Sequence, residues 1–284
     1  MALRLLTETD RPALEAFLGK HQDSSMILRS NLMRVGIDYE GERFQAHYFG
    51  AFQGSELVAV AAHNQNGVLF LQAPVQVDAV ALGAVAASAR PVTGFIGPGD
   101  DVRQARAALG MNGAATRKDG EEGLYALELS ELVVPVALAN GALVCRAPRP
   151  EDTATLYEWR VAYDVEVLGG ADTPAARENA AGFIDWQIAD GSAHVATDKG
   201  ALVAYCGFNS RVPDMVQLGG VYTPPALRGR GYARAAIASK LLVERERGVT
   251  RAVLFTDDDD PKAVGCYAAL GFRRTGAYGF VLFA

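Results

Sequence analysis

The sequence has few cysteines, no long uninterrupted apolar run and no excess of positive charge. Its three cysteines, Cys145, Cys206 and Cys266, are odd in number and widely spaced, and they form no CxxC pair. This usage argues against a disulfide framework and fits a reducing compartment. The longest stretch without an acidic or basic residue, 57–77, is interrupted in its middle by polar residues and does not suit a membrane helix.

The chain is acidic, with 27 Lys and Arg against 33 Asp and Glu, so a basic face for nucleic acid or anionic lipid has no support. Glu8 and Asp10 come too early for the apolar core of a signal peptide. The four histidines lack the spacing of metal ligands. We therefore expect a soluble cytoplasmic protein with no metal, no nucleic-acid partner and no membrane association.

A length of 284 residues favours two domains, and the order of predicted elements repeats at a period of roughly 160 residues. Each half is predicted as β-α-α-β-β-β-α-β-α-β, which is an α/β fold of the α+β type. The first-half elements are strand 3–6, helices 11–20 and 26–35, strands 48–52, 57–62 and 68–73, helix 77–89, strand 92–96, helix 102–109 and strand 124–129. The second-half elements are strand 142–146, a helix from Glu151, helix 174–189, strands 192–197, 201–209 and 215–223, helix 232–247, strand 250–256, helix 261–270 and strands near Arg273 and Phe280.

The strongest local signal is the run Arg228-Gly229-Arg230-Gly231, which lies between a predicted strand and a predicted helix. The two glycines let the backbone turn tightly and bring successive N–H groups close to a ligand. The following helix adds its unpaired N-terminal donors and the positive end of its dipole, and the two arginines add charge. This combination predicts a phosphate site.

Two common phosphate-binding patterns are absent. There is no G-x-x-x-x-G-K-[ST] run, and Arg234 stands where a Rossmann fingerprint needs its third glycine. What remains, Arg228-x-x-Gly231-x-Ala233, resembles the pyrophosphate loop of the GNAT superfamily of acyl-CoA N-acyltransferases. The order of elements over about residues 216–275, including the run from Pro261 through Tyr267 to Gly271 and Phe272, is similar to that family as well.

The resemblance implies two GNAT-like domains, each with a mixed, mostly antiparallel central sheet flanked by helices. We expect a degenerate N-terminal domain at 1–130, a linker at 131–141 and an acetyltransferase domain at 142–284. In the first domain, residues 71–78 offer neither glycine nor arginine where the loop belongs, and Arg106 occupies the position of Tyr267.

Carried over to this sequence, the resemblance implies that backbone N–H groups from Gly229 to Ala233 hold the pyrophosphate of acetyl-CoA. The backbone of the strand before the loop would pair with the pantetheine arm, and Tyr267 would protonate the departing thiolate as general acid. The expected coenzyme-binding residues are Val221, Tyr222, Thr223, Arg228, Gly229, Arg230, Gly231, Tyr232, Ala233 and Asp260.

Several roles stay open at this stage. Many relatives carry a glutamate on the fourth strand as general base, whereas residues 217–221 hold no carboxylate, and the base could be Asp214, Glu151 or Asp185 acting through water. Tyr267 could instead anchor its helix to the sheet. The acidic run that ends at Asp260 is more simply a solvated loop with a helix cap. The aromatic residues that could line an acceptor pocket or fill the core are Trp159, Tyr163, Trp186 and Tyr205.

The leading hypothesis is an acetyl-CoA-dependent N-acetyltransferase in which a primary amine of a small molecule attacks the thioester directly. One alternative is a tandem-domain acyltransferase acting on a thiol or sugar conjugate, similar to the mycothiol synthase family. The other is a non-catalytic acyl-CoA-binding sensor or partner module. The sequence names neither the acceptor, the acyl chain length nor the oligomeric state.

Overall fold

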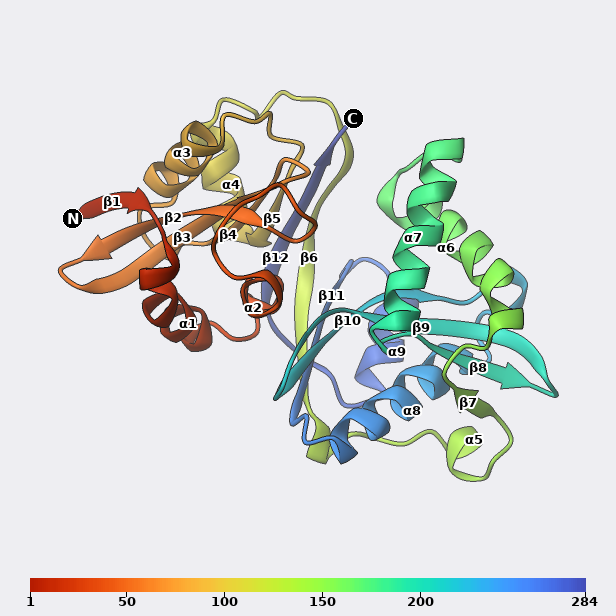
Figure 1. The fold of residues 1–284 in the computed structure, drawn as a ribbon. Helices are drawn as coiled ribbons and strands as arrows, with labels where there is room; N and C mark the ends of the chain where they lie inside the picture. The colour runs from red at the N-terminus through yellow and green to blue at the C-terminus, as the bar shows by residue number, and fades with distance from the viewer. The chain divides into compact units, whose positions relative to one another are not determined.

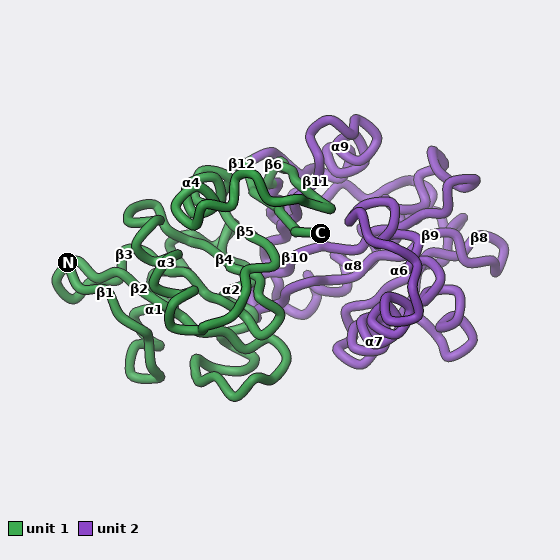
Figure 2. The backbone as a smooth tube through the Cα atoms, turned by 90° about the horizontal axis from the view of Figure 1, so that it is seen from above, with its two compact units in different colours: residues 1–124, 275–284 green, residues 125–274 purple.

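The protein is described here by a computed structural model of residues 1–284, which divides into two compact units (Figure 2). Unit 1 comprises residues 1–124 and 275–284, and unit 2 comprises residues 125–274. Each unit is a layered α/β structure with its own set of strands, which belong to one 12-stranded sheet, and its own apolar cores (Figure 1). No helix combines the length and the apolar character needed to cross a bilayer.

Unit 1 contains a sheet whose strands follow the order β1-β2-β3-β4-β5-β12. Strands β2, β3 and β4 form an antiparallel meander, and β4 then runs parallel to β5 through the crossover helix α3. Helices α3 and α4 cover one face of the sheet, and α1 and α2 lie on the other (Figure 1). The elements that lie wholly in this unit are β1 (Ala2–Leu5), α1 (Arg11–Lys20), α2 (Met26–Val35), β2 (Ala46–Gln53), β3 (Glu56–Asn64), β4 (Val68–Gln72), α3 (Val77–Ser88), β5 (Gly94–Pro98) and α4 (Gly99–Ala108).

Unit 2 repeats this plan, with β11, β10, β9, β8 and β7 adjacent in that order. The crossover helix α8 packs on β7, β8 and β9, while α6 and α7 lie together on the opposite face (Figure 1). The largest core fills the space between the sheet and α8, and a smaller one lies under α6 and α7. The elements are α5 (Val136–Ala139), β7 (Val144–Arg146), α6 (Thr153–Leu168), α7 (Pro174–Ala189), β8 (His194–Asp198), β9 (Ala201–Val212), β10 (Met215–Tyr222), α8 (Tyr232–Glu246), β11 (Arg251–Thr256) and α9 (Pro261–Ala268).

The predicted fold class and the predicted order of elements are confirmed in both halves. Local chemistry explains several boundaries. Helix α7 begins at Pro174 because Thr173 accepts a hydrogen bond from Ala176 N at 3.2 Å, and Gly169 ends α6 in a left-handed conformation that a glycine adopts without strain. The two short strands predicted near Arg273 and Phe280 are a single strand in the structure, β12 (Arg273–Phe283).

The last strand of each half of the sequence extends into, or belongs to, the other unit. Strand β12 pairs antiparallel with β5, where Tyr278 lies opposite Pro98 and Leu282 opposite Gly94, so residues 275–284 belong to unit 1. Strand β6 (Thr116–Glu128) crosses the division at residues 124 and 125, and its last residues flank β11 in unit 2. The two halves have strands of similar apolar pattern, so the pattern alone does not predict which strand a final strand pairs with.

The segment expected as a linker, 131–141, has regular structure within unit 2. It contains the short helix α5, and Val133 N donates to Leu270 O at 3.1 Å. Leu132 and Leu143, which border the segment, are buried in the larger core. These contacts tie the segment to the body of unit 2.

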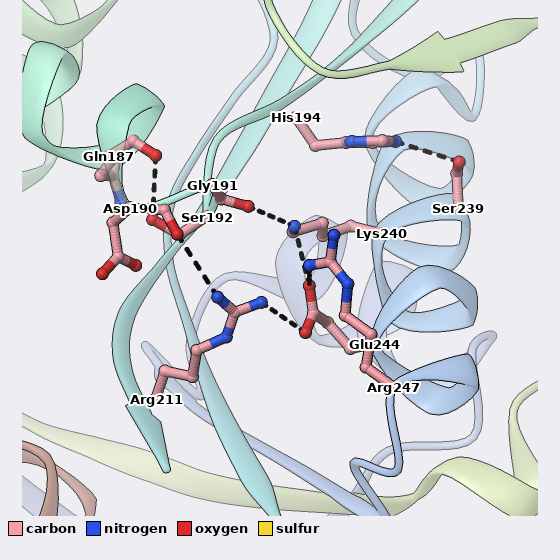
Figure 3. Close-up of polar contacts among 10 residues, drawn as sticks. All are labelled: Gln187, Asp190, Gly191, Ser192, His194, Arg211, Ser239, Lys240, Glu244 and Arg247. Atoms are coloured by element: carbon pink, nitrogen blue, oxygen red, sulfur yellow. Dashed lines mark hydrogen bonds and ion pairs between the residues drawn. The ribbon is translucent and has the colours of Figure 1, made fainter. Parts of the chain in front are cut away.

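A buried ionic network joins α8 to the strands and loop beside it (Figure 3). Glu244, 1% exposed, pairs with Lys240 at 2.9 Å, with Arg247 at 3.0 Å and with Arg211 of β9. Lys240 also donates to Gly191 O at 2.6 Å. Burial alone would raise the pKa of Glu244, but the hydrogen bonds from Lys240 and Arg211 outweigh it and lower the pKa. The carboxylate therefore stays charged and fixes α8 against its neighbours.

His194 lies beside this network, and its Nε2 is 3.0 Å from Ser239 Oγ on α8 (Figure 3). The imidazole is 6% exposed, and burial together with the positive charge of Lys240 lowers its pKa from 6.5 to about 4. The folded state therefore holds this histidine neutral over a pH range in which the unfolded chain protonates it.

We expect acid to destabilise the protein through His194. Between pH 6.5 and pH 4 the unfolded state binds the extra proton, so stability rises with pH in this window and up to about 3 kcal/mol is lost as pH falls through it. Denaturant titrations at pH 7, 5.5 and 4.5 measure the free energy of unfolding. A His194→Gln variant should show a shallower pH dependence than wild type, and an identical slope in both proteins would contradict this account.

Candidate functional site

The central feature of unit 2 is the short pairing between β10 and β11. The two strands run parallel for three residue pairs, from Met215 opposite Arg251 to Gln217 opposite Val253, and the pairing ends there. On its other edge β10 stays paired with β9 as far as Tyr222 opposite Tyr205. We call the open region after the last pair the fork, defined by residues 218–222 of β10 and 254–256 of β11. Its β10 edge offers backbone N–H and C=O groups without a strand partner, which an extended ligand can use.

An irregularity in β10 shapes the fork. The register with β9 shifts between Gly219 and Tyr222, and Gly220 has a φ of +66°. A side chain at Gly219 would collide with Asn209, because its Cβ would fall 1.9 Å from Asn209 Nδ2. The positive φ favours glycine at position 220, and a side chain at position 219 would require the Asn209 side chain to move. The bulge turns the backbone groups near Val221 out of the regular ladder.

The glycine loop, residues 228–231, follows the fork and leads into α8. Gly229 and Gly231 have φ values of +78° and +81°, and Gly231 caps α8 without a side-chain hydrogen bond. A Cβ at Gly229 would meet no atom within 4 Å. The first N–H groups of α8 are thus free of side-chain caps at an open, positively charged turn, an arrangement suited to an anion.

Arg228 is held in place by α6. Its Nη1 and Nη2 donate to the two carboxylate oxygens of Glu166 at 2.6 and 2.7 Å, and its Nε donates to Thr223 O at 2.9 Å. The hydrogen bond from Arg228 lowers the pKa of Glu166, and the same bond raises the pKa of Arg228. Arg230 is exposed, and its guanidinium reaches Ala226 O at 3.3 Å. Glu166 was not singled out from the sequence, because it lies 62 residues away from its partner.

Two of the expected coenzyme contacts have other partners. The Tyr232 side chain is buried and donates to Asp198 at 2.7 Å, so only its backbone N–H faces the loop. Asp260 caps α9 by accepting hydrogen bonds from Lys262 N at 2.9 Å and Ala263 N at 3.2 Å. This cap is the simpler role that the sequence offered for the acidic run.

Tyr267 lies on α9 and packs against the larger core, with its ring 6.0 Å from that of Phe272. Burial raises its pKa well above the ordinary value, and Cys266 and Tyr163 of α6 raise it further. The phenol is therefore protonated at neutral pH, as a proton donor must be.

The three candidate bases have defined surroundings. Asp185 accepts a hydrogen bond from Tyr157 at 2.6 Å. Asp214 offers its backbone carbonyl to the start of β11. Glu151 is exposed and lies 3.8 Å from Arg149. The structure gives none of them a distinguishing contact, and no group of three or more His, Cys, Asp and Glu side chains converges on a metal-sized site.

Gln217 was not predicted to be a functional residue, because the sequence analysis considered only carboxylates as the general base on this strand. It is 3% exposed at the last residue pair before the fork, and its Nε2 has no hydrogen-bond partner. Thr223 Oγ1, where the strand leaves the fork, is also buried without a partner. Unsatisfied buried polar atoms are rare and mark places where a ligand or water completes the structure.

The cysteines are unsuited to nucleophilic catalysis. Burial raises the pKa of the Cys145 and Cys266 thiols to about 11, and Cys206 is fully buried with a pKa raised further by the same cause. All three are therefore thiols rather than thiolates at neutral pH.

Unit 1 closes the corresponding region. Strands β4 and β5 are parallel over three pairs as well, but a Cβ at Gly97 would lie 2.6 Å from Leu71 O, so the strands stay close beyond the last pair. Asp101, 5% exposed, accepts a hydrogen bond from Ala73 N at 2.6 Å and so occupies the end of β4. Arg106, at the position of Tyr267, pairs with Asp119 at 2.8 Å.

Comparisons with known proteins agree with this geometry. Residues 153–272 match the acetyltransferase (GNAT) family. Mycothiol acetyltransferase of Nocardia farcinica is 29% identical over 179 residues, which cover 58% of this chain and 55% of that protein. The matched region thus spans about half the length of that relative.

Two solved structures share the fold over nearly the whole chain. A GCN5-related N-acetyltransferase of Sphaerobacter thermophilus superimposes with a TM-score of 0.60 at 16% identity, covering 99% of this chain and 94% of that one. A tandem GNAT protein from the clavulanic acid biosynthesis pathway gives 0.57 at 14% identity, covering 99% and 97%. Residues 153–272 of unit 2 therefore match the GNAT acetyltransferase family, and the chain as a whole shares its fold with these two structures.

Proposed function

We propose that this protein is an acetyl-CoA-dependent N-acetyltransferase that acts on a primary amine of a small molecule, with a single coenzyme site in unit 2. The observation that carries the proposal is the fork followed directly by the glycine loop and the uncapped start of α8. The unpaired edge of β10 can pair with an extended, amide-containing arm. The glycine loop, which follows the end of this strand, can bind a pyrophosphate. Both are needed to hold acyl-CoA.

The residues of the fork would carry the reaction. Backbone N–H groups near Val221 polarise the thioester carbonyl and stabilise the negative oxygen that forms when the amine nitrogen attacks the carbonyl carbon. Collapse of the tetrahedral intermediate breaks the carbon–sulfur bond, and Tyr267 gives its proton to the departing sulfur. The amine loses its proton to water or to a base reached through water. Gln217, whose buried Nε2 lacks a hydrogen-bond partner at the last β10–β11 pair, would bind that water or the acceptor.

A second candidate function has support from one relative. The similarity to mycothiol acetyltransferase favours an acceptor that is a thiol or sugar conjugate. A non-catalytic acyl-CoA-binding module is the third candidate, because residues 217–221 lack the carboxylate that many relatives use as base. Measuring coenzyme affinity and turnover separately in variants of this site distinguishes an enzyme from a non-catalytic binding module.

A Gly231→Trp variant should lose measurable coenzyme A binding, because a bulky side chain at a left-handed position both strains the loop and blocks the start of α8. Calorimetric titration of coenzyme A and acetyl-CoA measures affinity and the number of sites, and wild type should show one site per chain. Gly200→Trp is the matched control, since Gly200 also has a positive φ but lies in the turn before β9. Retained affinity in Gly231→Trp would refute the assignment of the loop.

Tyr267→Phe should reduce turnover by roughly 10² to 10⁴ while coenzyme affinity stays within a few fold, because the variant removes only the proton donor. Steady-state kinetics with an amine panel and titration of acetyl-CoA measure the two effects. Tyr278→Phe, whose hydroxyl contacts Ser24 O in unit 1, is the control for loss of a buried hydroxyl. Unchanged turnover in Tyr267→Phe would leave this residue only its packing role.

Glu166→Gln should raise the affinity for coenzyme A by about two- to fivefold, since the carboxylate competes with the pyrophosphate for the exposed Arg228. Pantetheine, which lacks the pyrophosphate, should bind both proteins equally. Glu158→Gln on the same helix, which removes an ion pair with Arg177 instead, is the control. A fall in coenzyme A affinity would mean that Glu166 positions Arg228 rather than competing for it.

A further inference from the structure

Arg160 of α6 extends over the bulge in β10. Its Nη1 lies 3.4 Å from the place that a Cβ on Gly220 would occupy, so the guanidinium rests on the face of the strand beside the fork. The side chain is 14% exposed. No sequence pattern singled out this arginine, because its neighbour in space is a glycine 60 residues further along the chain.

The guanidinium is fixed in one orientation. Nε donates to Asp164 Oδ2 at 3.2 Å, and Nη2 lies 2.8 Å from Oδ1 of the same carboxylate. The charged group also sits over the rings of Phe183 and Tyr163, 4.0 and 5.2 Å from their centroids. Aspartate and rings together hold the plane of the group, so little side-chain entropy remains to be lost when a ligand binds.

Asp164 uses one edge of the fixed guanidinium and leaves the other available. The structure gives Nη1 no protein acceptor, and its two N–H groups lie against Gly220. A guanidinium edge of this kind recognises a carboxylate with good geometry. A simple alkylammonium acceptor would meet an unfavourable positive charge at the same place.

We propose that Arg160 binds a carboxylate of the acceptor, so that the substrate class is a small amine that also carries a carboxylate. The inference rests on the proposed acetyltransferase function and extends it to the acceptor. With the thioester carbonyl beside Val221, a carboxylate held at the neighbouring Gly220 keeps the acceptor at the fork, and its amine can approach the carbonyl carbon. Trp159, whose ring centroid is 6.0 Å from that of Tyr222, supplies apolar surface next to Arg160.

The test compares matched acceptors. L-amino acids and 4-aminobutyrate are assayed with acetyl-CoA, each beside its carboxamide, and the acetylated product is measured by mass spectrometry. Wild type should prefer the carboxylate form. Arg160→Gln should raise KM for the carboxylate acceptor by about 10- to 100-fold with kcat little changed, and the amide acceptor should be unaffected. Arg160→Lys keeps the charge but loses the planar edge, so its KM for the carboxylate acceptor should lie between those of wild type and Arg160→Gln.

Controls separate this effect from loss of structure. Arg177→Gln removes an arginine of α7 that pairs with Asp172 and Glu158, and it should leave the preference for carboxylate over amide unchanged. Calorimetric titration of coenzyme A shows that each variant keeps the coenzyme site. Wild type that fails to bind coenzyme A would refute the proposed function itself.

Three other outcomes would overturn the inference alone. Equal use of each acid and its amide by wild type would remove the carboxylate from recognition. An equal fall in kcat for both acceptors in Arg160→Gln would assign the arginine to the oxyanion instead. Coenzyme binding without acetylation of any member of the panel would show that the acceptor class is a different one.

Discussion

The pairing of β10 with β11 ends after three residues, and the other parts of the site depend on where it ends. Pairing between two parallel strands normally continues as long as both backbones stay extended, because buried backbone N–H and C=O groups are nearly always hydrogen-bonded. Here the register with β9 shifts between Gly219 and Tyr222, and Gly220 has a positive φ, so β10 departs from a regular ladder. The strand therefore keeps one edge paired with β9 and one edge that has no strand partner.

Helix α6 connects the parts of the site on one face of the sheet. Trp159 contacts Tyr222, Arg160 lies over Gly220, and Glu166 binds Arg228 in the glycine loop. Arg160 and Glu166 are six residues apart, which is about 9 Å along a helix axis. One helix thus contacts both the fork and the glycine loop, so a displacement of α6 would move Arg160 and Glu166 together.

The sequence predicted the elements well because hydrophobic periodicity, caps and glycines act locally. The helices expected at 26–35 and 232–247 match α2 (Met26–Val35) and α8 (Tyr232–Glu246) closely, and the glycine loop lies between strand and helix as its composition indicated. These local signals do not predict contacts between residues that are far apart in the sequence. Nothing local says that β12 joins β5, that Glu166 meets Arg228, or that Arg160 reaches Gly220, since each depends on how elements far apart in the chain pack.

The duplicated halves show how small differences decide whether a fork is open. In unit 1, Asp101 satisfies Ala73 N at the end of β4, and burial raises the pKa of this carboxyl to about 6. At this point the edge of β4 is thus satisfied by a contact within the chain. In unit 2 the aspartate that begins the equivalent helix, Asp260, turns to the N–H groups of its own helix instead, which leaves β10 unsatisfied.

The surroundings of Tyr267 bear on the proton transfer that we propose for it. A phenol with a raised pKa is a weaker acid than an ordinary thiol, so it would not protonate a thiolate in water. The same burial raises the pKa of the neighbouring Cys266 thiol to about 11, because a charged sulfur is poorly solvated there. A thiolate leaving at this position would be destabilised in the same way and become a strong base. The burial that raises the pKa of Tyr267 would therefore also raise the pKa of the departing thiol in the proposed step, and the two effects would offset each other.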